Sequence, residues 1–251
     1  MISRRMSSII GSMEKDIEQI IDQNRVAYDD IAGHFSDTRR FLWPDLTFIL
    51  SFVKEGDRVL DVGCGNGRLY QLFYDSSIGK GSGQIRFFGI DNSEPLIDLA
   101  RAEYPTGKFC VGDMRSLPYD DNSMDVIVSL VAFHHLPDRQ NQSDALLEMA
   151  RVVTSSGTII LVNWNAYSDW VKEKIVNGEY HCLGDNLFLV PWRDQDGTVR
   201  GNRVYYGFLP TELEELAAKI GLNVVDQYYL RHGERVGVDR GMNLVTILSN
   251  I

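Results

Sequence analysis

The sequence predicts an α/β fold in which a mostly parallel sheet is covered by helices on both faces. Short apolar segments alternate with helical patterns along the middle of the 251-residue chain, and this rhythm is typical of parallel sheets. A glycine-rich turn follows the first of these segments. The last two apolar segments have no helical pattern between them, so we expect them to pair antiparallel at the edge of the sheet.

The N-terminal region, residues 1–54, is expected to form a helical cap. Apolar residues recur there at helical spacing, which predicts an amphipathic helix. These residues are Ile10, Met13, Ile17, Ile20, Ile21, Tyr28 and Ile31. A second helix is expected after Trp43, because Pro44 suits the first turn of a helix.

Residues 55–163 are predicted to form a cofactor-binding core. The expected strands span residues 58–62, 85–90, 108–111, 124–131 and 157–163, and the expected helices span residues 66–74, 94–102 and 141–153. Residues 164–209 show no clear periodicity and are too long for a simple connection, so we interpret them as a lid or a substrate-side insertion. Residues 210–251 contain a predicted helix at 211–220 and strands at 223–230 and 243–250. We expect these regions to form a single domain.

The composition narrows the class of protein. Hydrophobic residues make up 44% of the chain and charged residues 24%, as in ordinary globular proteins, and the net charge of −10 is not that of a typical nucleic-acid binder. No apolar run approaches the roughly 18 residues that span a membrane. The N-terminal apolar stretch runs into Glu14, so we expect no export signal. Three scattered cysteines (Cys64, Cys110 and Cys182) indicate reduced thiols, a cytoplasmic location and no metal site.

The stretch "VLDVGCGNG" (residues 59–67) has the pattern of a nucleotide cradle. Glycines allow positive φ angles and the close approach of a ligand to the backbone, and the following helix offers unpaired N–H groups. Asp91 ends the next strand, where a carboxylate can accept hydrogen bonds from both hydroxyls of a ribose, and Asp113 follows the third strand. The glycine spacing is G-x-G-x-G, whereas the dinucleotide fingerprint is G-x-G-x-x-G.

This pattern resembles the class I S-adenosylmethionine (SAM)-dependent methyltransferases. The resemblance covers residues 55–163 and the final strand pair, and it implies a Rossmann-like, seven-stranded, mostly parallel sheet with an antiparallel last strand. It implies SAM as the cofactor, with the glycine loop at the methionine moiety, Asp91 at the ribose and Asp113-Met114 beside the adenine. The cofactor-binding residues that it implies are Asp61, Gly63, Gly65, Gly67, Asp91, Asn92, Asp113, Met114, Ser129 and Leu130.

Three further stretches resemble the eukaryotic-type tRNA wobble-uridine methyltransferases, which esterify a 5-carboxymethyl group. They are "YDDIAGHFSDTRRFLWP" (28–44), "VAFHHL" (131–136), and "FLVPWR" (188–193) followed by "RVYYGF" (203–208). The chain has Gly207 where that family usually has a histidine. The resemblance implies a tRNA substrate and a small zinc-binding activator subunit.

The chemistry implied by this resemblance needs orientation more than proton transfer. A carboxylate acceptor is ionised at neutral pH and needs only a cation to fix it, and the planar fork of Arg39 suits that role. His134 and His135 are the candidate bases for a hydroxyl or amine acceptor instead. The aromatic residues Trp43, Trp164, Trp192, Tyr205 and Tyr206 are candidates to stack a flipped base. His34 and Arg203 complete the expected substrate-binding residues.

Two other functions remain open at this point. One is a small-molecule methyltransferase acting on a quinone precursor or a free carboxylic acid, and the other is a catalytically silent SAM-binding regulator. If tRNA is the substrate, we expect arginines to gather at the mouth of the SAM cleft. The arginines concerned are Arg39, Arg40, Arg193, Arg200, Arg203, Arg231, Arg235 and Arg240.

Overall fold

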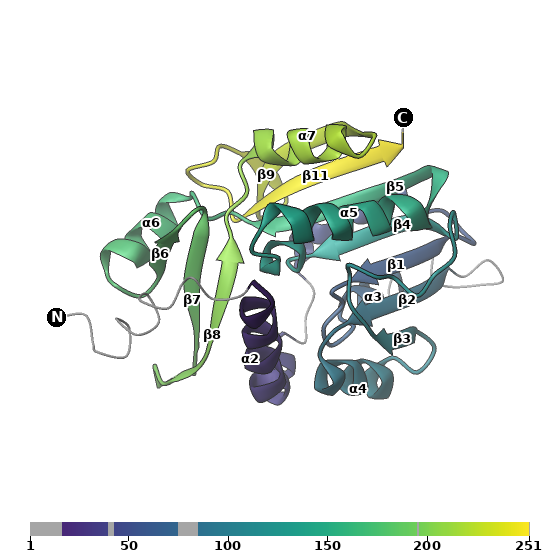
Figure 1. Cartoon of the computed structure of the whole chain (residues 1–251). Helices are drawn as coiled ribbons and strands as arrows, with labels where there is room; N and C mark the ends of the chain where they lie inside the picture. Colours follow the sequence, from purple (N-terminus) through teal and green to yellow (C-terminus); the bar gives the residue numbers. More distant parts are fainter. Residues whose placement is uncertain (1–16, 40–42, 75–84, 195, 251) are drawn as a thin grey trace.

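The computed structural model describes residues 17–39, 43–74, 85–194 and 196–250. Its centre is an eight-stranded sheet with helices on both faces (Figure 1). The strands follow the order β10-β9-β11-β5-β4-β1-β2-β3. The mixed α/β class with a large, mostly parallel sheet is therefore confirmed.

The parallel part of the sheet contains the five strands expected from the core segments. They are β1 (Arg58–Val62), β2 (Arg86–Asp91), β3 (Lys108–Val111), β4 (Met124–Leu130) and β5 (Val153–Trp164). The chain order reverses between β1 and β4, which pair parallel with each other. Ligands of open α/β sheets bind beyond the carboxyl ends of the strands at such a switch point.

The C-terminal strands differ in one respect from the expected edge pair. β9 (Leu222–Arg231) and β11 (Asn243–Asn250) pair antiparallel as predicted, but β11 lies inside the sheet, between β9 and β5. A short strand that the sequence pattern did not reveal, β10 (Glu234–Val236), pairs with β9. The described sheet therefore has eight strands where seven were expected.

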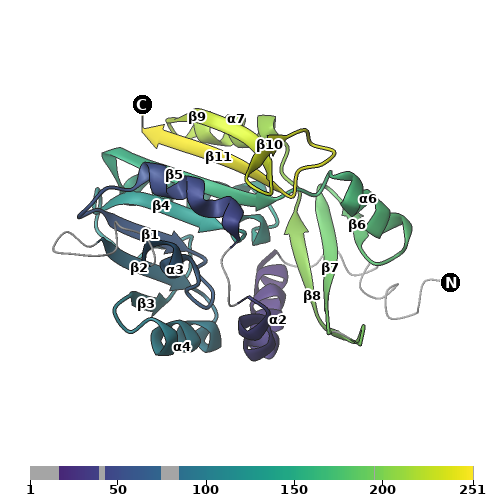
Figure 2. The same cartoon turned by 180° about the vertical axis from the view of Figure 1, so that it is seen from behind.

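Helices and apolar side chains cover both faces of this sheet. α5 (Arg139–Val152) and α7 (Pro210–Lys219) pack on one face (Figure 1). The 3₁₀ helix η1 (Pro44–Phe52), α3 (Leu69–Tyr74) and α4 (Glu94–Glu103) pack on the other (Figure 2). Successive residues of β1 point to opposite faces of the sheet. Leu60 packs in the core on the side of α5 and α7, and Val59 packs in the core on the side of η1, α3 and α4. η1 begins at the expected proline, whereas α3 begins later than expected because residues 66–68 still belong to the turn.

The insertion builds a second sheet rather than an irregular lid. After α6 (Asp169–Val176), strands β6 (His181–Gly184), β7 (Leu187–Arg193) and β8 (Val199–Tyr206) form a three-stranded antiparallel sheet. The N-terminal helix α2 (Ile17–Thr38) lies between β8 and α4 (Figure 1). Ile10 and Met13 of the predicted periodicity lie outside the described residues. α2 thus lies between the small sheet and the carboxyl ends of the parallel strands.

Candidate active site

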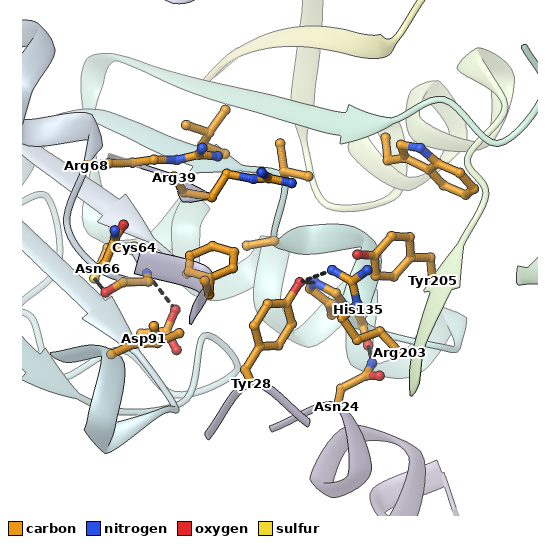
Figure 3. A pocket seen from close by; sticks show the side chains of 18 of the residues that line it. Asn24, Tyr28, Arg39, Cys64, Asn66, Arg68, Asp91, His135, Arg203 and Tyr205 are labelled. Atoms are coloured by element: carbon orange, nitrogen blue, oxygen red, sulfur yellow. Dashed lines mark hydrogen bonds between the residues drawn. The ribbon is translucent and has the colours of Figure 1, made fainter. Parts of the chain in front are cut away.

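A cavity of about 480 Å³ lies where the carboxyl ends of the parallel strands face α2 and the small sheet. Its wall has two parts (Figure 3). The glycine-loop half comes from the ends of β1, β2, β3 and β4, and the aromatic half comes from α2, β7, β8 and the segment after β5. Ligand cavities commonly have this size and combine apolar walls with a few polar groups.

The glycine loop is fixed by the backbone of β2. The N–H groups of Gly63 and Cys64 donate to the carbonyl of Ile90 at 2.8 and 3.0 Å. Gly63 has φ +77°, and a Cβ there would lie 2.2 Å from the Cβ of Ala132. Gly65 has φ +53°, and a Cβ built there would make only ordinary contact, with the Phe35 ring at 3.7 Å. Only glycine therefore fits at position 63, and the loop keeps an open face toward the cavity.

Two carboxylates sit behind this loop. Asp91 accepts hydrogen bonds from the N–H groups of Gly65 (2.8 Å) and Ser93 (2.9 Å), and burial raises its pKa against the effect of these bonds. Asp61 is 1% exposed, and its Oδ1 has no hydrogen-bond partner among the described residues. Burial and the neighbouring Asp91 raise the pKa of Asp61 to about 8, while Arg68 acts in the opposite direction.

An unpaired buried carboxylate oxygen at a cavity wall fits the cationic amino group of a methionine moiety, and Asp91 remains open to the cavity for a ribose. The residues present therefore fit SAM.

Asp113 is held by an arginine that the sequence did not single out. The guanidinium of Arg115 donates to both carboxylate oxygens, and its backbone N–H donates to Oδ1 at 2.8 Å. Burial acts to raise the pKa of Asp113, but these bonds and the arginine charge lower it. Arg115 also binds Glu18 of α2, so the adenine end of the predicted site is linked to the N-terminal helix.

The aromatic half carries guanidinium groups stacked on rings. Arg39 and Arg203 lie 5.3 and 4.8 Å from the centre of the Trp192 ring. Arg203 donates to the hydroxyl of Tyr28 at 3.4 Å and is 8% exposed, although its Nε has no partner among the described residues. Burial and the charge of Arg203 lower the pKa of Arg39. Figure 3 shows these side chains reaching into the same space.

Arg68 also lines the cavity, and it was missed in the sequence. It precedes α3 directly, is 8% exposed and lies 4.6 Å from the centre of the Trp43 ring. Burial and the charge of Arg39 lower the pKa of Arg68 to about 10. Its place immediately after the last glycine of the loop is the signal that could have identified it.

The two histidines differ in position. His135 lines the cavity, with its Nε2 3.0 Å from the hydroxyl of Tyr28, and burial together with Arg203 lowers its pKa to about 3. His134 is completely buried and outside the cavity wall, and burial and His135 hold its pKa well below the usual range. Both imidazoles are therefore neutral at neutral pH.

Most predicted site residues line this one cavity. They are Arg39, His135, Asp61, Gly63, Gly65, Asp91, Asn92, Asp113, Met114, Leu130, Trp43, Trp192, Arg203 and Tyr205, together with Trp164. Five predicted residues do not line it, namely His134, Gly67, Ser129, His34 and Tyr206. Their roles at the site, like those of the lining residues, remain predictions of the sequence, and the structure shows what these five contact instead.

These five residues lie outside the cavity wall. Gly67 faces the ring of Phe109, 3.0 Å from where a Cβ would lie, and Ser129 is fully buried. His34 accepts a hydrogen bond from the Trp192 indole at 2.9 Å, and the Tyr206 hydroxyl donates to Glu212 at 2.8 Å. Gly207 leaves no room for the histidine usual at its position, because a Cβ there would lie 2.6 Å from that of Ala166.

The eight arginines expected at the cleft mouth divide into groups. Arg39 and Arg203 line the cavity, and Arg193 and Arg231 are chain neighbours of the lining residues Trp192 and His232. Arg200 and Arg235 are paired with Asp194 and Asp226. Arg240 accepts a hydrogen bond from Arg231 through its backbone carbonyl, and Arg40 lies outside the described residues. The expected gathering of arginines at the mouth of the cleft is therefore only partly present.

The described residues offer neither a metal site nor a membrane-spanning helix. No group of three or more His, Cys, Asp or Glu in these ranges could hold a metal ion. None of the described helices combines the length and the apolar character needed to cross a membrane.

Comparison with known proteins agrees with this geometry. Residues 60–161 match the family model of a methyltransferase domain. The chain is 32% identical over 147 residues to the tRNA (carboxymethyluridine(34)-5-O)-methyltransferase alkbh8 of Xenopus tropicalis, covering 59% of this chain and 22% of that protein. It is 30% identical over 165 residues to the Saccharomyces cerevisiae tRNA (carboxymethyluridine(34)-5-O)-methyltransferase, covering 66% of this chain and 54% of that one. The chain thus spans between about a fifth and about half of the length of these relatives.

Solved structures share the fold. A SAM-dependent methyltransferase of Methanosarcina mazei has a TM-score of 0.62 and 22% identity, covering 84% of this chain and 99% of that one. A putative methyltransferase of Haloferax volcanii was solved in complex with the Trm112 methyltransferase activator. It has a TM-score of 0.64 and 22% identity, covering 90% of this chain and 96% of that one. Residues 60–161 are therefore a methyltransferase domain, the fold around them is that of the class I SAM-dependent methyltransferases, and the cofactor is SAM. Within that class the chain is similar to the tRNA carboxymethyluridine methyltransferases.

Proposed function

We propose that the protein transfers the methyl group of SAM to a carboxylate, most specifically to the carboxymethyl group of a tRNA wobble uridine. The observation that carries this proposal is the pair of guanidinium groups, Arg39 and Arg203, both stacked on Trp192 in the cavity that also contains the glycine loop. Arginines at a cavity wall that have no carboxylate partner among the described residues favour an anionic ligand. The names of the curated relatives support the same acceptor.

The chain's own groups have two tasks in this reaction. SAM, when bound, supplies a methyl group activated by the positive sulfonium. Asp61 and Asp91 would hold the cofactor's amino group and ribose, and Arg39 would hold the acceptor carboxylate so that one of its oxygens can accept the methyl group. The acceptor is already ionised, because the reference pKa of a carboxylic acid is about 4, so no proton has to leave.

The neutral histidines agree with this absence of proton transfer. His135 is bonded to Tyr28, and its low pKa makes it a weak base. We assign it to the wall that positions Tyr28 and Arg203. Trp43, Trp164, Trp192 and Tyr205 line the same cavity and offer ring faces on which an unstacked base can lie.

The direct test is methyl transfer to tRNA. The protein is incubated with labelled SAM and tRNA that carries carboxymethyluridine without its ester, with and without an activator of the Trm112 type, and the nucleosides are identified by mass. The expected product is the methyl ester of 5-carboxymethyluridine. Asp91→Ala is the inactive control, and Arg86→Met, at the opposite end of β2, is the matched surface control.

A second candidate is a free carboxylic acid as acceptor. It is favoured by the net charge of −10 and by the ion pairs that neutralise Arg200 and Arg235. Methyl transfer to a small acid but not to tRNA would establish it. SAM binding without transfer to either acceptor would instead indicate a regulator.

A small zinc-binding activator subunit is the partner we propose, and a structural neighbour was solved with the Trm112 methyltransferase activator. Co-expression with an activator of that type, followed by co-purification, tests this partner independently of the acceptor. Retention of the two proteins as one complex through gel filtration supports it, and their separation contradicts it.

A further inference from the structure

Arg68 is a cavity arginine that the function described above does not use. It leaves the glycine loop one residue after Gly67, at the start of α3, and its guanidinium lies over the ring of Trp43 from the N-terminal cap. Its Nη1 is buried and has no hydrogen-bond partner among the described residues. A guanidinium nitrogen left unpaired in a buried site costs free energy unless a ligand completes it.

The charges around Arg68 are unbalanced. Asp61 is the carboxylate that stabilises its charge, and Arg39 is the like charge that opposes it. Arg39 is opposed in turn by Arg203. The other acids at the wall have partners of their own: Asp113 is bound by Arg115, Asp91 accepts from two backbone N–H groups, and Asp45 accepts from the N–H of His232. Arg25 also lines the cavity but is paired with Asp22 and Asp29. Asp61 is the wall carboxylate that acts on Arg68, and its Oδ1 has no hydrogen-bond partner among the described residues.

Cofactor binding would engage this carboxylate. The amino group of SAM would pair with Asp61, which then no longer serves Arg68 alone. An anion placed between Arg39 and Arg68 relieves their mutual repulsion, and Figure 3 shows the two side chains extending side by side into the cavity. Two adjacent guanidinium groups can bind both oxygens of one carboxylate.

We propose that Arg68 is the second arm of the acceptor site and binds the acceptor carboxylate together with Arg39. This inference rests on the proposed carboxylate acceptor. Arg39 follows α2, whereas Arg68 follows the glycine loop that holds the cofactor. Arg68 thus fixes the carboxylate relative to the cofactor loop, and Arg39 fixes it relative to the cap. Arg68 selects an anionic acceptor and orients it toward the methyl.

Binding measurements test this role without turnover. The protein is saturated with S-adenosylhomocysteine, and 5-carboxymethyluridine is titrated in by calorimetry. For Arg68→Met we expect the affinity for the nucleoside to fall at least about tenfold, because one charge-assisted contact is lost. Arg68→Lys keeps the charge but lacks the planar fork, so its affinity for the nucleoside should lie between those of the wild type and Arg68→Met. Arg86→Met should bind as the wild type does, and thermal melting checks that each variant is folded.

The competing role for Arg68 is binding of the cofactor's own carboxylate. Arg68→Met would then weaken S-adenosylhomocysteine binding and leave the nucleoside affinity unchanged, which overturns the inference. Phenylacetate serves as a second probe, since it carries a carboxylate on an aromatic ring. Failure of both probes to bind the wild type, or equal binding to wild type and Arg68→Met, also overturns it. The tRNA assay judges the proposed function separately.

Discussion

The carboxylate of Asp91 accepts a hydrogen bond from the backbone N–H of Gly65 at 2.8 Å and so joins the end of β2 to the glycine turn after β1. Its other oxygen accepts from Ser93, which caps α4. One side chain therefore holds the loop, the strand end and the helix start in register around the predicted ribose site. Replacing it should change both the ligand contacts and the shape of the loop.

Asp91→Ala is expected to weaken SAM binding by about 1.5–3 kcal/mol, or roughly 10- to 150-fold, because the ribose hydroxyls lose a charged acceptor. Isothermal titration of SAM measures the effect. Asp113→Ala should weaken binding less, because that carboxylate is already occupied by Arg115 and the adenine is also held by apolar packing. Asp98→Ala, on the exposed face of α4, is the control. Unchanged SAM affinity in Asp91→Ala would remove this residue from the site.

Asp61 should make SAM binding depend on pH. Its pKa in the free protein is about 8, so at pH 6–7 it is mostly protonated. A cationic amino group beside it lowers that pKa, so binding releases a proton, and the affinity should rise from pH 6 toward pH 8 by up to about tenfold per unit. Titration in two buffers of different ionisation enthalpy counts the proton. Asp61→Asn should bind weakly and without this rise, and a flat profile in the wild type would contradict the assignment.

The glycine turn offers a steric prediction. Gly63→Ala places a Cβ 2.2 Å from that of Ala132 at a φ of +77°, so the loop must move, and we expect both lower thermal stability and loss of SAM binding. Gly33→Ala is the matched control, since this helical glycine meets nothing within 4 Å and should gain about 0.5–1 kcal/mol of stability. Melting curves with and without SAM compare the two variants. A Gly63→Ala protein that melts and binds like the wild type would show that the turn adapts.

The glycine-loop half of the cavity could be predicted from the sequence because its chemistry is local. A strand, a glycine turn and the acids that end neighbouring parallel strands must meet at one edge of the sheet. The aromatic half depends on which face of a strand each residue occupies. Tyr205 and Tyr206 are adjacent, and neighbouring residues on a strand point to opposite faces, so only one of them reaches the cavity. The pattern alone did not indicate which one.

The sequence pattern also could not show the strands of the insertion or the burial of Arg68. β7 is a nearly continuous apolar run because the sheet it belongs to is covered on both sides, so it lacks the alternation that reveals a half-exposed strand. His134 and His135 are likewise adjacent, and only the second faces the cavity. Arg68 was missed because a lone arginine after a glycine turn is more often exposed, and its burial depends on Trp43 from a distant part of the chain.

Arg39 should affect methyl transfer and not cofactor binding. Arg39→Lys keeps the charge but loses the planar fork over Trp192, so single-turnover transfer should slow while SAM affinity stays the same. Arg39→Ala should slow transfer further, by about 3–4 kcal/mol at most, on the scale of one charge-stabilising donor. Rapid-quench kinetics at saturating SAM measure both variants beside Arg86→Met. If transfer is indifferent to Arg39, the acceptor carboxylate lies elsewhere.

The pH dependence of the transfer step separates a carboxylate acceptor from an amine or a hydroxyl. A carboxylate is ionised throughout pH 6–9, and its reference pKa is about 4, so the single-turnover rate should be nearly flat when SAM is saturating at every pH. The histidines add no transition in this window, because burial and Arg203 hold the pKa of His135 near 3 and His134 lies well below its usual range. An amine or hydroxyl acceptor must lose a proton during transfer, so its rate should climb with pH. His135→Ala should weaken acceptor binding more than it slows the transfer step, because it removes the support of Tyr28. A rate that rises tenfold per pH unit below neutrality, abolished by His135→Ala and unaffected by Arg39→Lys, would replace the carboxylate mechanism with general-base catalysis.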